Sequence, residues 1–208
     1  MLLMTPPVPI QVPNVPFYSQ FQDIQSTTWQ KVGCGITSLA MVIDYYKPDS
    51  VTVNQLLGQG ILAGAYDTNA GWIHKGLISL STKYGMEGNS YNFSSSKQSV
   101  AFAEFKKFLD DGPVIVSIHY KFNPKSTIPH LVVIEGIQNG VIYYNDPALK
   151  TGQKTISTED FQKGWKKKFI VIRPKPENKE LTLDLINKNN GLVLLNQNNN
   201  SKTTSIHF

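Results

Sequence analysis

The chain contains a single cysteine, Cys34, in the stretch GCGITSLAMVIDYY (33–46). Apolar residues recur after it at spacings of three and four, which predicts an amphipathic helix over about 35–46. A cysteine at a helix start meets unpaired N–H groups and the positive end of the helix dipole, which stabilise a thiolate. We expect Gly33 and Gly35 to let a substrate backbone approach. The pattern indicates a thiolate nucleophile, and the alternative is a small buried hydrophobic residue.

A thiolate nucleophile requires a base, and the base requires a group that orients it. His130 opens the segment HLVVIEGI after a loop, so its ring can point into a cleft. Asp146 ends the next segment, and Asn139–Gly140 between the two predicts a hairpin. Counting outward from the turn, 137 faces 142 and 133 faces 146, give or take a residue. This places Asp146 near the end of the sheet where His130 begins, although Asp146 alone also fits an Asx-type turn before a proline.

The other histidines fit structural roles. His74 lies in a predicted helix as a packed or exposed surface residue, His119 lies within a predicted strand, and His207 lies in the C-terminal tail. One cysteine excludes a thiolate zinc cage, and the histidine spacings lack an HExxH pattern. We therefore expect no metal and no cofactor.

Four helices are predicted before the strands begin. Thr52 is the expected N-cap of the second helix, and Gly85 and Gly112 are expected to end the third and fourth. The predicted helices are 35–46, 50–61, 72–85 and 100–112.

The apolar period then changes from 3.6 to 2, which indicates strands. Helices followed by antiparallel strands predict an α+β fold, with N-terminal helices packed on a C-terminal antiparallel sheet. The predicted strands are 113–120, 130–138, 140–147 and 167–174, residues 15–21 are predicted as extended, and 22–33, 64–71 and 88–98 are predicted as loops.

Composition limits the function classes. The net charge of +5 is modest, and the one dense lysine cluster, KGWKKKF (163–169), is predicted to be a solvated face rather than a phosphate or cell-wall contact. A nucleic-acid partner is not expected, because such proteins carry a longer basic stripe with interleaved aromatic residues. No apolar run is long enough to span a membrane, and residues 1–18 lack the regions of a signal peptide, so we expect a soluble protein of open compartment.

Three regions differ in composition. Residues 1–14 form a proline-rich lead-in, 15–173 form the predicted domain, and 174–208 form a tail rich in Asn and Lys. Within the tail, LTLDLI and GLVLL could add two strands, and the final dozen residues are predicted to be disordered.

Over about 15–173 the chain resembles the papain-like C39 peptidase superfamily, and specifically its stand-alone C39-like branch. The Cys-Gly-x-x-Ser helix start, followed later by the His-Leu-Val-Val-Ile and Asn-Asp-Pro block, carries the resemblance. The matching segments are VPFYSQ (15–20), GCGITSLAMVIDYY (33–46), GWIHKGLISLSTKYGM (71–86), FLDDGPVIVSI (108–118), HLVVIEGIQNGVIYYNDPA (130–148) and ISTEDFQKGWKKKFIVI (156–172).

The resemblance implies that Cys34 is the nucleophile, His130 the base and later the acid, and Asp146 the orienting group. It also implies a glutamine that helps to bind the oxyanion beside the Cys34 N–H group. Gln20 matches the stand-alone members, and Gln30 is the alternative nearer in sequence. Transporter-linked members have a glutamine six residues before the cysteine, where this chain has Thr28.

The implied activity is that of a cysteine peptidase, or an amide hydrolase more broadly, acting as a monomer on a peptide or protein. A papain-fold transpeptidase similar to phytochelatin synthase would keep the thioester and change the acceptor. A peptide-binding C39-like module without activity and a cell-surface domain with an incidental fold are further alternatives. Substrate selection is expected from the loop 121–129 or from the tail.

Overall fold

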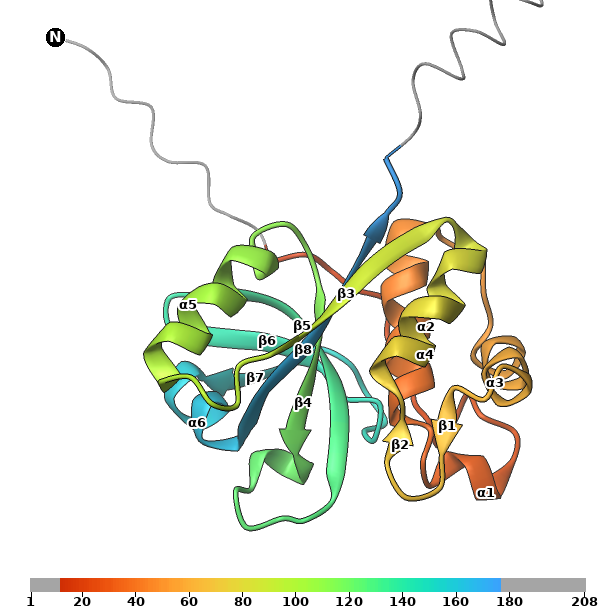
Figure 1. The fold of residues 1–208 in the computed structure, drawn as a ribbon, viewed down its shortest axis with the longest axis horizontal. Coiled ribbons are helices and arrows are strands. Elements are labelled where there is room, and N and C mark those ends of the chain that lie inside the picture. The colour runs from red at the N-terminus through yellow and green to blue at the C-terminus, as the bar shows by residue number, and fades with distance from the viewer. Residues whose placement is uncertain (1–11, 177–208) are drawn as a thin grey trace, which may run out of the picture. The chain divides into compact units, whose positions relative to one another are not determined.

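The computed structural model describes residues 12–176 (Figure 1). Most of the lead-in, the two tail strands, the predicted disordered end and His207 therefore lie outside the described residues. The residues described up to Pro174 belong to one compact unit. Between residues 12 and 176, no helix combines the length and the apolar character that crossing a bilayer requires.

The described part of the chain forms six α-helices, two short 3₁₀ helices and eight strands. The helices are α1 (Thr27–Gln30), α2 (Cys34–Tyr46), α3 (Val53–Leu62), α4 (His74–Ser81), η1 (Thr82–Tyr84), α5 (Gln98–Leu109), η2 (Tyr120–Phe122) and α6 (Thr158–Gly164). The strands are β1 (Tyr66–Asp67), β2 (Gly71–Trp72), β3 (Met86–Asn92), β4 (Val114–His119), β5 (Pro129–Gln138), β6 (Val141–Asn145), β7 (Lys154–Ser157) and β8 (Trp165–Pro174).

Six strands form one antiparallel sheet in the order β3-β8-β4-β5-β6-β7. Helices α2, α3 and α4 lie on one face of the sheet, and α5 and α6 lie on the other (Figure 1). Both faces are buried because helices cover each of them. Neighbouring residues of a strand point to opposite faces and so join different core clusters. Ile115 and Val133 belong to the core cluster that includes α2, whereas Val116 and Val132 belong to the cluster that includes α5.

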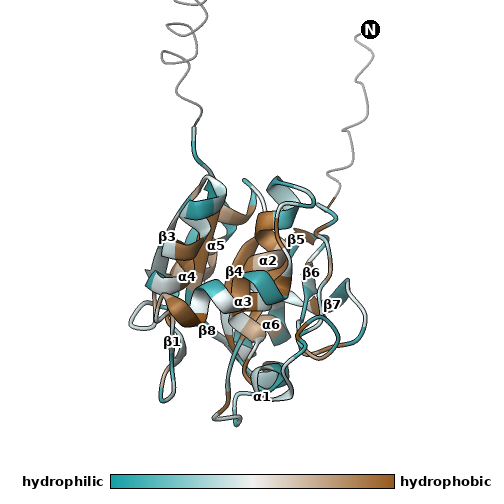
Figure 2. Ribbon diagram, turned by 90° about the vertical axis from the view of Figure 1, so that its right-hand side faces the viewer, coloured by the Kyte–Doolittle hydropathy of each residue, from teal (hydrophilic) through white to brown (hydrophobic). Residues whose placement is uncertain are grey.

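The helical layer and the central strands supply most of the apolar interior. Figure 2 shows hydrophobic residues concentrated on α2 and β4, with hydrophilic residues toward the outer loops. Helix α2 is buried along nearly its whole length. It is therefore the central helix of the fold, and its first residue has a fixed place relative to the sheet.

The α+β prediction is confirmed, and the four predicted helices and four predicted strands are present. Their ends lie within three residues of the predicted ones, except that α4 ends at Ser81 and the predicted third helix continues as the 3₁₀ helix η1. Thr52 Oγ1 accepts a hydrogen bond of 3.2 Å from the backbone N of Gln55, so it is the N-cap of α3. Asn139 and Gly140 both have positive φ, as a two-residue hairpin turn between β5 and β6 requires.

The predicted hairpin register is correct next to the turn and shifts further along. Ile137 pairs with Ile142, but an irregularity between Ile134 and Gly136 makes Val133 pair with Asn145 instead of residue 146. This β-bulge inserts Glu135 as the extra residue. Asp146 therefore lies one position beyond the last ladder pair, in the loop that leaves β6.

Several elements were missed by the sequence prediction. The stretch 88–98 was expected to be a loop, but β3 occupies its first part and pairs with β8. Strand β3 is at the edge of the sheet and is rich in polar residues, so it lacks an apolar alternation that a sequence pattern can detect. The loops expected at 22–33 and 64–71 also contain short elements, α1 and the β1–β2 hairpin.

The solvated face predicted for the lysine cluster 163–169 is wrong for its central residues. Lys166, Lys167 and Lys168 are half-buried in β8, between the core residues Trp165 and Phe169. Lys167 Nζ donates a hydrogen bond of 2.7 Å to the carbonyl of Ser96. Long-range pairing of β8 with β3 and β4 places these lysines inside the sheet, which the local charge pattern does not indicate.

Candidate functional site

Cys34 is the first residue of α2 and lies half-buried at a cleft of about 880 Å³. The residue before it, Gly33, is the N-cap, and its carbonyl accepts the N–H of Thr37 at 3.0 Å. Ser38 Oγ donates to the carbonyl of Leu131 in β5 at 3.4 Å, which holds α2 on the sheet. The thiol therefore lies at the positive end of a helix that is fixed against β5.

The two glycines beside Cys34 serve packing, which corrects the expectation that they leave room for a substrate. A Cβ on Gly33 would lie 2.3 Å from Ile24 Cδ1, and a Cβ on Gly35 would lie 2.6 Å from the Trp72 side chain. Trp72 is anchored by its indole N–H, which donates to the Val32 carbonyl at 2.7 Å. Protein side chains thus already fill the space beside both glycines.

His130 and Asp146 meet as the hairpin predicted. His130 Nε2 donates to Asp146 Oδ1 at 2.6 Å, and both residues are only 5% exposed. The same oxygen accepts the backbone N–H of Ala148 at 2.8 Å, so the Asx-type turn and the contact with His130 are both present. The rings of Tyr120 and His130 pack edge to face, with their centroids 5.2 Å apart.

The imidazole of His130 also interacts with the Cys34 side chain. Burial alone would lower the pKa of His130, but hydrogen bonds to Asp146 and Cys34, together with the charges of both groups, raise it to about 9. Because Nε2 is bound to Asp146, Nδ1 is the ring nitrogen left to face the sulfur. Sulfur, imidazole and carboxylate thus lie together, drawn from α2, β5 and the loop after β6, with the imidazole hydrogen-bonded to the carboxylate.

The two candidate glutamines lie side by side but differ in their access to the cleft. Gln20 lines the cleft, and its Nε2 donates to the Gln30 carbonyl at 2.7 Å. The backbone N–H of Gln20 donates to the Pro147 carbonyl at 2.8 Å, which ties it to the loop that carries Asp146. Gln30 does not line the cleft, and its Nε2 donates to the Ile24 carbonyl at 2.8 Å. Only Gln20 of this pair therefore faces the space beside Cys34.

The two other described histidines also differ in whether they line the cleft. His119 is hydrogen-bonded to the Ser126 carbonyl and does not line the cleft, in line with a structural role. His74 does line the cleft, with its ring nitrogens 2.9 Å from Ser90 Oγ and 3.2 Å from Ser117 Oγ. His74 is half-buried at the start of α4, within the expectation of a packed or exposed surface residue. Its place in the cleft wall was not foreseen, because it depends on β3 and β4 bringing these two serines to the start of α4.

Sequence reasoning also missed Trp72, Tyr120 and Lys168, which line the cleft. Their positions depend on contacts between distant segments, and a local motif does not signal those. Within residues 12–176, no group of three or more His, Cys, Asp or Glu side chains is placed to hold a metal ion.

Comparisons with known proteins agree with this architecture. Among solved structures, a double glycine motif protease from an AMS/PCAT transporter, in complex with the leader peptide, is 23% identical with a TM-score of 0.55, covering 81% of this chain and 97% of that chain. A C39-like peptidase from Bacillus anthracis is 19% identical with a TM-score of 0.57, covering 79% and 96%. The peptidase domain of Streptococcus ComA is 20% identical with a TM-score of 0.52, covering 70% and 93%.

At these identities the solved structures show a shared fold. No curated protein matches the chain. The family model described as the Peptidase_C39 like family matches residues 12–168, which is well over half of the chain. The match spans α2 with Cys34, β5 with His130 and the loop with Asp146. This chain therefore belongs to the Peptidase_C39 like family and has the papain-like fold of its peptidase domains.

Proposed function

We propose that this protein is a cysteine peptidase that cleaves peptide bonds with Cys34 as nucleophile, His130 as base and acid, and Asp146 as the group that orients His130. The observation that carries the proposal is one imidazole at the wall of a large cleft, hydrogen-bonded to Asp146 at 2.6 Å and close enough to the Cys34 side chain for that group to raise its pKa. A nucleophile, a base and an orienter in contact are the minimum set for covalent acyl transfer.

The chemistry proceeds in two halves. The Cys34 sulfur attacks the substrate carbonyl carbon, and the carbonyl π electrons move to oxygen to give an oxyanion. The oxyanion collapses, the C–N bond breaks, and Nδ1 of His130 gives its proton to the leaving amine, which leaves a thioester on Cys34. His130 then takes a proton from water as the water attacks the thioester, and the acid product leaves as the thiolate re-forms.

Burial of the base–orienter pair supports this assignment. The raised pKa of His130 means that the ring is protonated near neutral pH, as the acid for the leaving amine must be. The Asp146 carboxylate holds Nε2 and stabilises the imidazolium that the cycle requires. Because both groups are almost inaccessible to water, their attraction is weakly screened.

Gln20 is the side-chain donor we assign to the oxyanion, beside the backbone N–H of Cys34. One N–H of its amide is bound to the Gln30 carbonyl, which fixes the amide and leaves the second N–H for a ligand. The cleft position of Gln20, and the absence of Gln30 from the cleft wall, support this choice among the described residues.

The test is an activity-based thiol probe on the full chain, followed by a peptide-library cleavage screen read by mass. Because Cys34 is the only cysteine in the sequence, one labelled site accounts for all thiol labelling. We expect specific cleavage by the wild type and none by Cys34→Ala. His130→Ala should be inactive, whereas the matched control His119→Ala, which changes a histidine outside the cleft, should remain active.

Three results would overturn the proposal. Full cleavage by Cys34→Ala would exclude the thiol as nucleophile. Products that gain an added amine but never a hydroxyl, when amine acceptors are supplied, would replace the hydrolase with a transpeptidase. Binding of library peptides without any turnover would indicate a peptide-binding module.

A further inference from the structure

One row of residues crosses the sheet directly beside His130. Leu131 pairs with Ser117, Ser117 pairs with Lys168, and Lys168 pairs with Asn92. Directly paired residues in antiparallel strands point to the same face of a sheet. All four residues line the cleft, so this row forms its floor.

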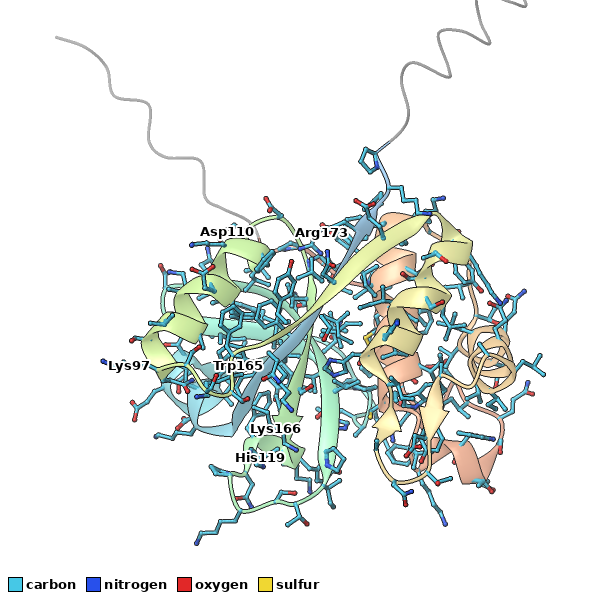
Figure 3. All side chains as sticks on the ribbon, viewed as in Figure 1. Lys97, Asp110, His119, Trp165, Lys166 and Arg173 are labelled. Carbon is cyan, nitrogen blue, oxygen red and sulfur yellow. The ribbon has the colours of Figure 1, made fainter. Side chains whose placement is uncertain are left out.

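The middle of this floor carries a group of bases. Lys168 is close enough to His74 and to Lys166 to repel their charged forms. Burial, together with the charge of Lys168, lowers the pKa of both His74 and Lys166. Figure 3 shows Lys166 near the end of β4 where His119 lies. We call Lys166, Lys168 and His74 the basic floor.

The basic floor has no counter-charge of its own. No Asp or Glu is among the cleft-lining residues that the structure describes, and across 12–176 neither Lys166 nor Lys168 has an ion-pair partner. Lys163, three residues before Lys166, is by contrast paired with Glu159 and Asp160 at 2.9 and 3.0 Å. Half-buried ammonium groups that repel one another are stabilised when an anion binds between them.

We propose that the basic floor binds a carboxylate carried by the peptide substrate, about three residues from the bond that is cleaved. Neighbouring strands lie about 4.8 Å apart, so the two steps from Leu131 to Lys168 cover about 10 Å, or about three residues of extended peptide. The substrates are therefore peptides with Glu or Asp near the cleavage site, or peptides whose C-terminal carboxylate lies at that distance. This inference rests on the proposed function, since it names the substrates of the same cleft.

The experiment compares matched peptides on the full chain. Peptides from the cleavage screen carry Glu or Gln at each position two to four residues from the cleaved bond, each as a free acid and as a C-terminal amide. We expect a kcat/KM at least about tenfold higher for Glu at one of these positions, because a charged hydrogen bond contributes that much binding. Lys168→Met should remove most of this Glu-to-Gln ratio.

The control is Lys107→Met, which makes the same charge change on the exposed surface of α5, and it should keep the ratio. A preference that depends only on the free C-terminus identifies the terminal carboxylate as the anion. Equal rates for Glu and Gln peptides of both forms, or an unchanged ratio in Lys168→Met, would overturn the inference while leaving the peptidase intact.

A binding measurement separates the two proposals. The same peptides are titrated onto Cys34→Ala by fluorescence anisotropy, alone and combined with Lys168→Met. A Glu-over-Gln preference in Kd that Lys168→Met removes supports the basic floor even if the wild type cleaves nothing, in which case only the peptidase proposal fails. Binding without such a preference contradicts the basic floor regardless of turnover.

Discussion

At the scale of single residues, Asp146 accepts two hydrogen bonds on one oxygen, from His130 and from the Ala148 N–H. An Asn at this position can keep both bonds through its carbonyl oxygen but loses the negative charge. We expect Asp146→Asn to retain the fold and to lower kcat by about 10²–10⁴-fold, since it removes the charge that orients and stabilises the imidazolium. Cys34→Ala and His130→Ala should lower kcat by about 10⁶-fold. Steady-state kinetics on a library-selected peptide measure all three, and an Asp146→Asn loss as large as that of Cys34→Ala would contradict the orienting role.

Gln20 and Gln30 form a second matched pair of residues. Both carry amides that donate to a backbone carbonyl, but only Gln20 also lines the cleft. We expect Gln20→Ala to lower kcat by about 10²–10³-fold, the loss typical of one oxyanion donor, with KM little changed. The kcat of Gln30→Ala should stay within about tenfold of the wild-type value. This substitution removes a side chain that supports the neighbouring loop, but it does not remove a hydrogen-bond donor to the oxyanion. Equal losses from the two substitutions would mean that Gln20 acts through packing alone.

The meeting of His130 and Asp146 could be predicted from the sequence because one Asn-Gly turn separates their strands, and the register can be counted from it. Cys34 was placed by the start of a helix that the apolar spacing predicted, although α2 is buried on nearly all sides and not on one face alone. His74 and Lys168 could not be placed in this way. Their positions depend on β8 pairing with both β3 and β4, and those partners lie about 50 to 80 residues away in the chain. Pairing over such distances is decided by the packing of the whole sheet.

At the scale of elements, the start of α2 depends on close packing against the β2 strand. Gly35 lies against the Trp72 side chain, which is held by its hydrogen bond to Val32 and cannot easily move. We expect Gly35→Ala to lower the free energy of unfolding by about 1–3 kcal/mol, since the added methyl overpacks the site. It should also lower activity, because Trp72 lines the cleft.

Gly58 in α3 provides the control for this prediction. It is exposed within the helix, and a Cβ there would meet nothing within 4 Å. Gly58→Ala should raise the free energy of unfolding by about 0.5–1 kcal/mol, through helix propensity alone. Urea unfolding followed by tryptophan fluorescence measures both variants. A stabilising Gly35→Ala would show that Trp72 moves aside without cost.

Strands and helices were missed where the sequence shows no regular alternation of apolar and polar residues. Strand β3 is mostly polar and lies at the sheet edge, so neither an apolar run nor an alternation marks it. Helix α6 is different, because its capping signal is present in the sequence. Ser157 Oγ accepts the Asp160 N–H at 3.0 Å and donates to the Asp160 carboxylate at 2.9 Å, a capping arrangement written as Ser-Thr-Glu-Asp. The helix could therefore have been predicted from its cap.

At the scale of the whole molecule, two buried groups make stability depend on pH in adjoining ranges. Glu135, the bulged residue of β5, accepts a hydrogen bond of 2.9 Å from Asn145, whose amide also donates to the Val15 carbonyl. Burial raises the pKa of Glu135 to about 7, although hydrogen bonds from the Val15 backbone and the Gln153 side chain oppose the rise. Glu135 thus titrates where the N-terminal segment, β5 and β6 meet.

The sign of each contribution follows from proton binding. Between pH 4.5 and 7 the folded state holds a proton on Glu135 that the unfolded chain has lost, so the stability associated with Glu135 falls as pH rises. The folded state likewise holds a proton on His130 between pH 6.5 and 9, so the stability that its partners provide is present below 6.5 and lost by about 9. The pKa of His74 is lowered, so below pH 6.5 its contribution to stability rises with pH. The total free energy of unfolding therefore does not show the contributions of Glu135 and His130 separately.

The contribution of each titrating group is isolated by the difference in unfolding free energy between the wild type and a variant that changes that group or its partner. The free energy of unfolding of the wild type minus that of Glu135→Gln should decrease between pH 4.5 and 7 and stay level above, since glutamine does not titrate. The same difference taken with Asp146→Asn should stay level up to about 6.5 and decrease toward 9, as His130 loses the proton that Asp146 stabilises. Urea titrations of the full chain at intervals of one pH unit measure both curves. A wild-type minus Asp146→Asn difference that stays level between pH 6.5 and 9 would mean that His130 is already neutral in the folded protein over this range. The imidazolium on which the proposed mechanism depends would then be excluded.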